Sequence, residues 1–310
     1  MKQTLKLSFE MTNTLSRIEH NGLKINTDTL EDIEKQYMDE MTMLETKLNR
    51  LAKNAMGDTP INLASPDDKS VLLYSRKVKD KSLWSLTFNL GHEMRGNTIK
   101  PKMRTRMKNK DFVQYVRRMT DIVYKTIGRQ CETCRGSGRI TPLKKDGSVG
   151  KAKRICKVCE GKGVVYTSTG EVAGFKIIPR TPRDTASAGF KTDKVTLEDR
   201  LSELSGDARE FCEAYVRYNA LRTYLSTFVE GMKNNVDDYN FIHPEFMQCV
   251  TATGRLSSRN PNFQNMPRGS TFAIRKVVES RFDDGFILEG DYSQLEFRVA
   301  GFLKIIRCTM

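Results

Sequence analysis

Two long stretches of the chain place apolar residues at intervals of three and four, the spacing of one face of an α-helix. The first follows Asp28, a plausible helix cap with Glu31 three residues later. Its apolar positions are Leu30, Ile33, Tyr37, Met41, Leu44, Leu48 and Leu51. The second runs from about Asp207 to Met232, with apolar positions Phe211, Tyr215, Tyr218, Leu221, Leu225, Phe228 and Met232. We expect two amphipathic helices that can pack as an antiparallel pair.

A third pattern leads to an acidic residue. Phe286–Leu288 is a short apolar run typical of a strand, and Gly290 and Asp291 end it. Ser293 and Glu296 have the spacing of a helix capping box. Apolar residues continue at helical intervals at Leu295, Val299, Phe302 and Ile306. Asp291 is therefore predicted at a strand end beside a helix N-terminus, a geometry that suits metal ions and phosphates. The alternative is an aspartate in a tight turn.

The positive charge of the chain is concentrated in one segment. The whole sequence has a formal net charge of +14, and residues 95–162 contain 20 Lys and Arg against 5 Asp and Glu. Such a local excess favours a surface that follows nucleic acid phosphates without reading sequence. The candidate DNA-binding residues in it are Lys100, Lys102, Arg104 and Arg106. The alternative is a solvated linker or a solubilising face.

Four of the seven cysteines form two matching motifs. Cys131 and Cys134, and then Cys156 and Cys159, each open a C-x-x-C-x-G-x-G knuckle. Two such knuckles supply four thiolates, which predicts one structural Zn²⁺ in a closed tetrahedral site. Unligated thiols and an iron site with the same ligands are the alternatives. The remaining cysteines are isolated and are expected to be packing residues: Cys212, Cys249 and Cys308.

Length and hydropathy bound the class of protein. The 310 residues suffice for two or three compact units. No apolar run approaches eighteen residues, and the first residues have no signal-peptide pattern. We therefore expect a soluble cytoplasmic protein without a membrane partner.

Two motifs near the end of the chain carry a resemblance. Thr251–Ser258 (TATGRLSS), followed by Asn260–Pro267 (NPNFQNMP), begins about 40 residues before Asp291–Arg298 (DYSQLEFR). In this order and separation they closely resemble family A DNA polymerases, the bacterial polymerase I and T7-like phage group. Weaker similarity lies at Met11–Leu30 and at Asn62–Pro66, so the resemblance covers most of the chain except about 95–180. The cysteine knuckles resemble the repeats of DnaJ chaperones, with one pair present instead of two.

The resemblance implies roles for individual residues. Asp291 and the Tyr292 carbonyl would hold Mg²⁺ in a two-metal site, and Glu296 would close against the sugar and select deoxynucleotides. The implied nucleotide-binding residues are Tyr292, Ser293, Gln294 and Glu296. The implied residues at the DNA minor groove are Arg255, Gln264 and Asn265. Glu289 departs from the small or apolar residue usual at its position. Two alternatives stay open for its side chain: a place near the metals, or a salt bridge elsewhere.

The resemblance also implies an α+β fold: a mainly helical thumb with a zinc-knuckle insertion, then the start of a palm of antiparallel sheet plus helices, which is incomplete. The expected division is 1–94 for the first part of the thumb, 95–182 for the basic zinc-binding insertion, 183–240 for the second part of the thumb and 241–310 for the N-terminal part of the palm. The family's second metal-binding aspartate and its fingers helix have no counterpart up to Met310. We therefore expect a truncated or split fragment that does not polymerise DNA alone.

Two classes of function follow from the sequence. The first is DNA-directed DNA synthesis in replication, with primer-template DNA and deoxynucleoside triphosphates as partners, a complementary chain, and a processivity factor as a further candidate partner. The second is a non-catalytic, zinc-containing DNA-binding remnant of a polymerase. A DnaJ-like client-binding module rests on the knuckles alone and ranks last.

Overall fold

The computed structural model describes residues 2–95, 98–141, 153–248, 250–251, 254–267 and 272–308. The chain divides into two compact units. Unit 1 comprises Met1–Met38 and Arg222–Met310, and unit 2 comprises Asp39–Leu221. Both combine helices with small antiparallel sheets, as the α+β expectation requires. Among the helices of the described residues, none is both long and apolar enough to cross a bilayer.

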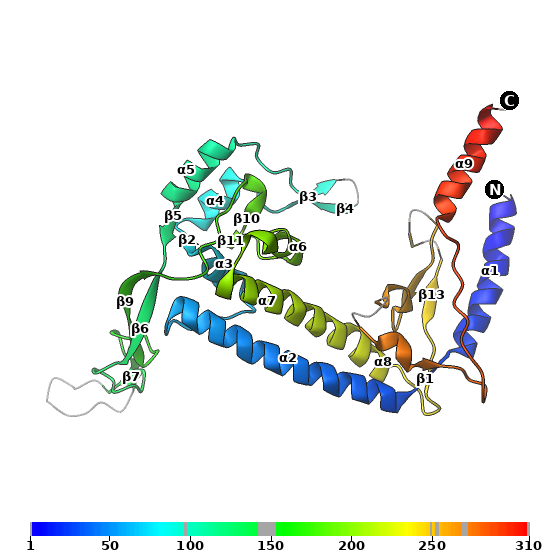
Figure 1. Cartoon of the computed structure of the whole chain (residues 1–310), viewed down its shortest axis with the longest axis horizontal. Coiled ribbons are helices and arrows are strands. Elements are labelled where there is room, and N and C mark those ends of the chain that lie inside the picture. The colour runs from blue at the N-terminus through cyan, green and yellow to red at the C-terminus, as the bar shows by residue number, and fades with distance from the viewer. Residues whose placement is uncertain are drawn as a thin grey trace. The chain divides into compact units, whose positions relative to one another are not determined.

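Unit 2 is organised around two long helices. These are α2 (Thr27–Met56), which enters unit 2 at Asp39, and α7 (Gly206–Tyr224), which leaves it after Leu221. Arg217 Nε contacts Glu40 Oε1 at 2.7 Å, and Lys47 Nζ contacts Glu210 Oε1 at 2.9 Å. Because the residue numbers rise along one helix and fall along the other, the pair is antiparallel, as the apolar stripes predict (Figure 1).

The core of unit 2 lies between these helices and the shorter elements that connect them. Trp84, Phe88 and Phe190 are fully buried, and the Trp84 ring lies 4.7 Å from Phe88 and 5.5 Å from Phe190 between centroids. The shorter helices are α3 (Pro66–Tyr74), α4 (Lys81–Thr87), α5 (Asn109–Met119), α6 (Lys194–Glu198) and the 3₁₀ turns η1 (Pro182–Asp184) and η2 (Leu201–Glu203). The strand pairs are β2 (Arg76–Val78) with β5 (Thr120–Ile122), β3 (His92–Arg95) with β4 (Thr98–Pro101), and β10 (Thr185–Ala186) with β11 (Gly189–Phe190).

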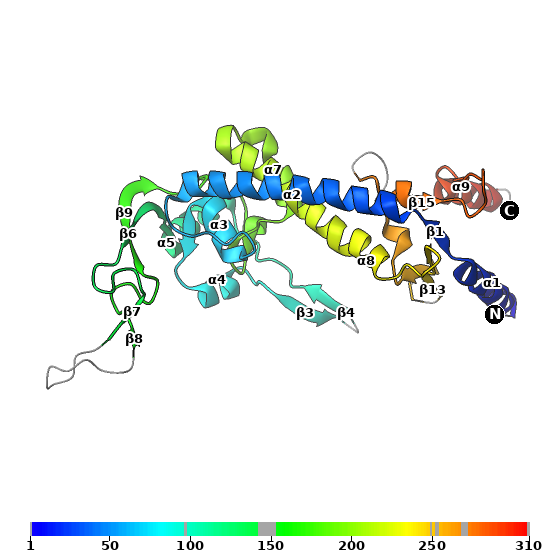
Figure 2. The ribbon, with the colours of Figure 1, turned by 90° about the horizontal axis from the view of Figure 1, so that it is seen from below.

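A two-stranded ribbon of unit 2 carries the four knuckle cysteines. Strands β6 (Tyr124–Gln130) and β9 (Val164–Val172) pair antiparallel, with Gln130 opposite Val164. The shorter pair β7 (Arg139–Ile140) and β8 (Arg154–Ile155) follows beyond the cysteines. In both views this ribbon leads away from helices α3, α4 and α5 of the same unit (Figure 2).

Unit 1 contains a three-stranded antiparallel sheet with the order β12–β1–β15. Leu23 lies opposite Ile242, and Ile25 lies opposite Val278. The strands are β1 (Leu23–Ile25), β12 (Phe241–Ile242), β15 (Val278–Glu279) and the separate pair β13 (Glu245–Met247) and β14 (Ser257–Arg259). The other elements are α1 (Lys2–Asn21), the π-helix η3 (Leu225–Val229), α8 (Glu230–Lys233), the 3₁₀ turns η4 (Phe263–Asn265) and η6 (Ile274–Val277), and α9 (Leu295–Cys308).

Four local details differ from the expectations. Helix α2 is capped by Asn26, whose Oδ1 accepts from the Thr29 N–H at 2.8 Å, and not by Asp28, which lies inside the helix. The helix predicted over 207–232 is interrupted by the five-residue π-helix η3. Residues Phe286–Leu288 form no strand, because no described strand lies beside them; Phe286 and Leu288 are 85% and 86% exposed. Helix α9 also begins at Leu295, two residues after the predicted cap.

Candidate functional sites

The four knuckle cysteines meet at one point in unit 2. All are buried, and their Sγ atoms lie within 4.8 Å of one another. Cys131 and Cys156 are 3.9 Å apart at sulfur, and Cys134 and Cys159 are 3.6 Å apart. A tetrahedral site with metal–sulfur bonds of about 2.3 Å requires sulfurs about 3.8 Å apart, whereas a disulfide bond requires about 2.05 Å. The arrangement fits a four-thiolate metal site.

The two knuckles repeat one another's backbone geometry. The Cys131 N–H donates to the Gly163 carbonyl at 2.8 Å, and the Cys156 N–H donates to the Gly138 carbonyl at 2.9 Å. Gly138 and Gly163 have φ of +68° and +74°, and a Cβ on either would come within 2.3 Å of a carbonyl oxygen of the opposite knuckle. Glycine is therefore required at both positions, because the knuckles approach each other through bare backbone.

Backbone donors tune the thiols. The Gly163 N–H donates to Cys159 Sγ at 3.3 Å. Burial raises the pKa of Cys159, but this N–H and the neighbouring thiols outweigh burial, and the pKa falls to about 7. At Cys134, burial and the hydrogen bond with Cys159 raise the pKa to about 11. The Gly163 N–H thus favours the thiolate of Cys159, the form in which cysteine binds a metal.

Of the isolated cysteines, the structure describes the side chain of Cys212. It is fully buried in the core of unit 2, and burial raises the pKa of its thiol to about 12, so it behaves as a packing residue. Cys249 and the side chain of Cys308 lie outside the described residues.

In unit 1 the structure brings together two residues from the separate motifs. Glu296, in the first turn of α9, accepts from Arg255 at 3.2 Å between Nη2 and Oε1, although the two are 41 residues apart. The Arg255 carbonyl in turn accepts from the Thr251 hydroxyl at 2.7 Å, which fixes the local turn. The predicted sugar gate, Glu296, and the predicted minor-groove arginine, Arg255, thus lie side by side.

The rest of the acidic motif is open to solvent. Asp291 and Tyr292 are exposed in an irregular segment before α9. The Ser293 carbonyl accepts from Arg298 Nε at 2.9 Å, and Gln294 has φ of +52°. Glu289 pairs with Arg275 at 3.0 Å, so of the two possibilities for this residue the structure has the salt bridge.

Gln264 and Asn265 lie on the 3₁₀ turn η4, directly after β14, and both are exposed. No hydrogen bond or ion pair of the described residues joins them to Arg255 or Asp291. The predicted DNA-binding cations belong to unit 2: Lys100 is exposed on β4, Lys102 and Arg104 are half-buried, and Arg106 is exposed.

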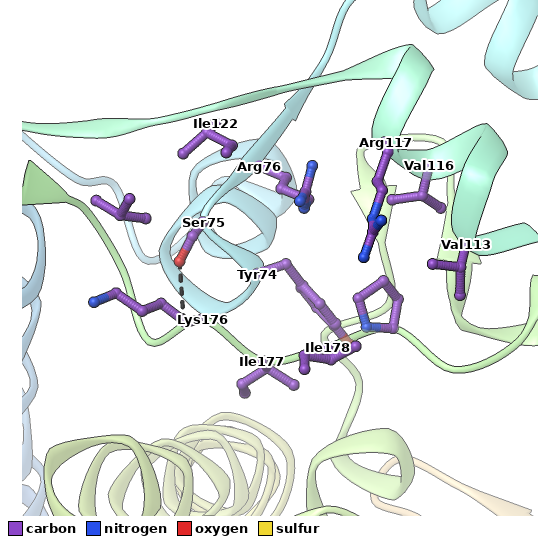
Figure 3. A pocket seen from close by; sticks show the side chains of 12 residues that line it. Tyr74, Ser75, Arg76, Val113, Val116, Arg117, Ile122, Lys176, Ile177 and Ile178 are labelled. Carbon is purple, nitrogen blue, oxygen red and sulfur yellow. Dashed lines mark hydrogen bonds between the residues drawn. The ribbon is translucent and has the colours of Figure 1, made fainter.

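A cavity of about 330 Å³ in unit 2 was not predicted from the sequence. Val113, Ile177 and Ile178 form part of an aliphatic wall, and the side chains of Arg76 and Arg117 extend into the opening above Tyr74 (Figure 3). It contains none of the predicted site residues. Its lining comes from three distant stretches, 74–76, 113–122 and 172–179, so no motif or spacing in the sequence signals it.

Comparison with known protein families finds similarity in the C-terminal part of the chain. Residues 175–304 match the family model described as DNA polymerase family A; this range includes Arg255, Asp291 and Glu296 and excludes the four knuckle cysteines. DNA polymerase I of Synechocystis sp. (strain ATCC 27184 / PCC 6803 / Kazusa) is 38% identical over 119 residues, which are 37% of this chain and 12% of that protein. The DNA polymerase of Bacillus phage SP01 is 31% identical over 175 residues, 53% of this chain and 18% of that protein.

Among solved structures, the POL domain of Pol1 from M. smegmatis, in complex with DNA primer-template and dNTP, aligns with a TM-score of 0.47 at 18% identity. The alignment covers 94% of this chain and 32% of that one. The chain spans less than a fifth of the length of the two sequence relatives.

Proposed function

Because residues 175–304 match the model of DNA polymerase family A, we propose that this chain takes part in template-directed DNA synthesis. The observation that carries the proposal is the contact between Arg255 and Glu296, which joins the two motifs of the family resemblance in one place. In this proposal the paired long helices belong to the thumb, and the residues from 241 onward belong to the palm.

We infer that the Asp291 carboxylate and the Tyr292 carbonyl hold Mg²⁺, because hard oxygen ligands are the ones that Mg²⁺ prefers. The Asp291 side chain is exposed, and no hydrogen bond or ion pair of the described residues engages it, so its oxygens are available to a cation. When bound, the metal neutralises charge on the reacting phosphoryl oxygens of nucleotidyl transfer.

Glu296 and Arg255 select the nucleotide and the base pair in this proposal. Glu296 closes against the sugar, and Arg255, with Gln264 and Asn265, donates to the minor-groove acceptors that all correct base pairs share. The Arg255–Glu296 ion pair is no obstacle, because its side chains are 75% and 77% exposed. An ion pair so exposed is worth at most about 1 kcal/mol, so DNA can replace it at low cost.

The surroundings of Asp291 support a need for further polypeptide. Large apolar side chains along the same segment are exposed: Phe282, Phe286, Leu288, Tyr292, Phe297 and Phe302. Several large exposed apolar side chains along one segment are typical of a surface that another part of a protein covers. We infer that the nucleotide site is completed when additional palm and fingers residues bury it.

We also propose that the four knuckle thiols hold one Zn²⁺ with a structural role. All four positions of the tetrahedron are filled by protein sulfur, which leaves no open position for a substrate or water. A second candidate function, DNA binding without catalysis, is favoured by the run of Lys and Arg at alternate positions of residues 100–110.

Primer extension separates these two functions. Residues 175–304 replace the matching segment of the Bacillus phage SP01 polymerase, and extension of a labelled primer is measured with Mg²⁺. We expect extension that Asp291→Asn lowers by more than about 100-fold, since even indirect changes around a metal cost 10–100-fold. Asp283→Asn, an exposed aspartate on the same segment, is the control and should retain activity. A chimera that binds primer-template but does not extend it contradicts the proposal and favours DNA binding alone.

A further inference from the structure

A groove of about 700 Å³ in unit 2 is lined on one side by residues 103–109 and on the other by Thr181, Pro182 and Arg183. Every charged residue of this lining is a cation: Arg104, Arg106, Lys108 and Arg183. None of the four forms an ion pair with another described residue, although Asp184, next to Arg183, is paired with Arg200 at 2.8 Å. The groove therefore concentrates positive charge that the described part of the chain does not neutralise.

Arg104 shows that this concentration is built into the fold. Its Nη1 atom is buried and has no hydrogen-bond partner among the described residues. Burial also lowers the pKa of Arg104. Buried polar groups are nearly always paired, because an unpaired donor loses its hydration without compensation. An acceptor bound in the groove would satisfy this donor.

The backbone holds Arg104 in this position. The Lys102 N–H donates to the Gly91 carbonyl at 3.0 Å, and Asn89 Nδ2 donates to the Met103 carbonyl at 2.9 Å. The Thr105 hydroxyl donates to the Thr87 carbonyl at 2.8 Å. The backbone is thus fixed before and after Arg104, which holds the base of its side chain at the groove.

The N-terminus of helix α5 lies in the same lining. Its cap residue, Lys108, makes no side-chain capping hydrogen bond, and Asn109 of the first turn lines the groove. The first N–H groups of a helix lack partners within the helix and carry partial positive charge, which favours anions. Cations and backbone donors therefore converge on one groove.

The sequence extends this charge into a row. From Lys100 to Lys110 every second residue is Lys or Arg. Two of the residues between the cations face inward: Thr105 donates a hydrogen bond to Thr87, and Met107 packs against the core. Arg106 and Lys108 are exposed. In extended chain, alternate side chains share one side and lie about 6.6 Å apart. A single phosphate would need one such cation, while a row suits a chain of phosphates.

We propose that this groove binds consecutive phosphodiester groups of one DNA strand, with Arg104, Arg106, Lys108 and Arg183 as the contacting cations. The proposal rests on the proposed function only for the identity of the polyanion as DNA. Relative to the sequence-based candidates it adds Lys108 and Arg183, while Lys100 and Lys102 do not line the groove.

The test is a salt titration of DNA binding by the full chain. Anisotropy of a labelled 20-nucleotide single strand is measured from 50 to 300 mM NaCl. Each phosphate contact contributes about 0.7 to the slope of log K against log salt. Arg104→Gln and Arg183→Gln are each expected to reduce the slope by about 0.7 and to weaken binding about fivefold at 0.1 M salt. Arg104→Lys, which keeps the charge, should retain the slope.

Lys79→Gln is the matched control, because it removes the same charge from unit 2 at a lysine already paired with Asp121 at 3.3 Å. Emission of Trp84 monitors folding of unit 2 in every variant. Equal slope changes for Lys79→Gln and Arg104→Gln, or no change for Arg104→Gln and Arg183→Gln, would overturn the proposal. Displacement of DNA by inorganic phosphate at constant ionic strength would also overturn the proposal, because it would identify the groove as a site for free phosphate. The chimera used to test primer extension lacks residues 103–109. The proposal for the groove and the proposal of DNA synthesis can therefore fail independently.

Discussion

Removing one thiolate of the cysteine cluster should unfold the knuckles. Cys156 is fully buried, and Cys156→Ser replaces a soft sulfur ligand by a hydroxyl that binds Zn²⁺ poorly. A structural zinc contributes about 10–16 kcal/mol in zinc-finger peptides. Among the described residues, the apolar side chains packed against the cluster are Ile140 and Val165, both partly buried, and full burial of such a side chain contributes about 1.5–3 kcal/mol. The metal therefore dominates the local stability.

The loss should remain local. The main core of unit 2 contains Trp84, the single tryptophan of the chain, and does not include the four knuckle cysteines. Trp84 has its own aromatic contacts with Phe88 and Phe190. We therefore expect Cys156→Ser, or a zinc chelator, to leave the emission of Trp84 unchanged while the knuckles become open to protease.

The assay measures zinc released from purified protein, tryptic cleavage within residues 131–163, and Trp84 emission. The chain should hold one zinc per molecule, and Cys156→Ser should hold none. Cys212→Ala is the matched control: it removes a buried thiol outside the cluster and should keep one zinc, although it costs stability in unit 2. Full zinc retention by Cys156→Ser, or loss of the Trp84 core on chelation, would refute this reasoning.

Two further predictions concern unit 2. The hydrogen bond from Arg217 lowers the pKa of Glu40 below its ordinary 4.5, so the pair stabilises the protein above that pH and the contribution is lost as pH falls through the lowered pKa. Glu40→Gln should lower Tm at pH 7 by up to about 3 °C, with a shrinking difference below pH 4.5; a difference that stays constant with pH would contradict this. Gly138→Ala places a Cβ 2.2 Å from the Gly161 carbonyl and should abolish zinc retention. Gly170→Ala, also at positive φ but with open space, should retain zinc; equal loss in both would assign the effect to backbone strain.

Periodicity predicted the long helices because their apolar faces are buried against each other over many turns. Leu48 and Phe211, from the two stripes, are both buried in the core of unit 2. Local capping chemistry was harder to predict, because Asn26 and Asp28 are both acceptable caps and only the backbone decides between them. The strand predicted over 286–288 failed because a strand depends on a partner, which an apolar run does not specify.

The candidate sites also differ in how far the sequence alone predicts them. The knuckles were predictable because ligands and turn glycines lie within a few residues of each other, so the motif contains the whole half-site. The Arg255–Glu296 contact could be expected only through the family resemblance, since 41 residues separate its members. The groove beside Arg104 was beyond sequence reasoning, because Arg183 reaches it from a distant segment.

The central claim, that Arg255, Asp291 and Glu296 belong to one deoxynucleotide site, is tested most directly by sugar selection. Single-nucleotide incorporation is measured in the chimera of residues 175–304, with matched deoxy- and ribonucleoside triphosphates, for the parent and for Glu296→Ala. Removing the side chain that closes against the sugar should raise ribonucleotide use relative to deoxynucleotide use by at least about tenfold. Such a gain cannot arise from unfolding. An unchanged ratio, with incorporation intact, would contradict the account.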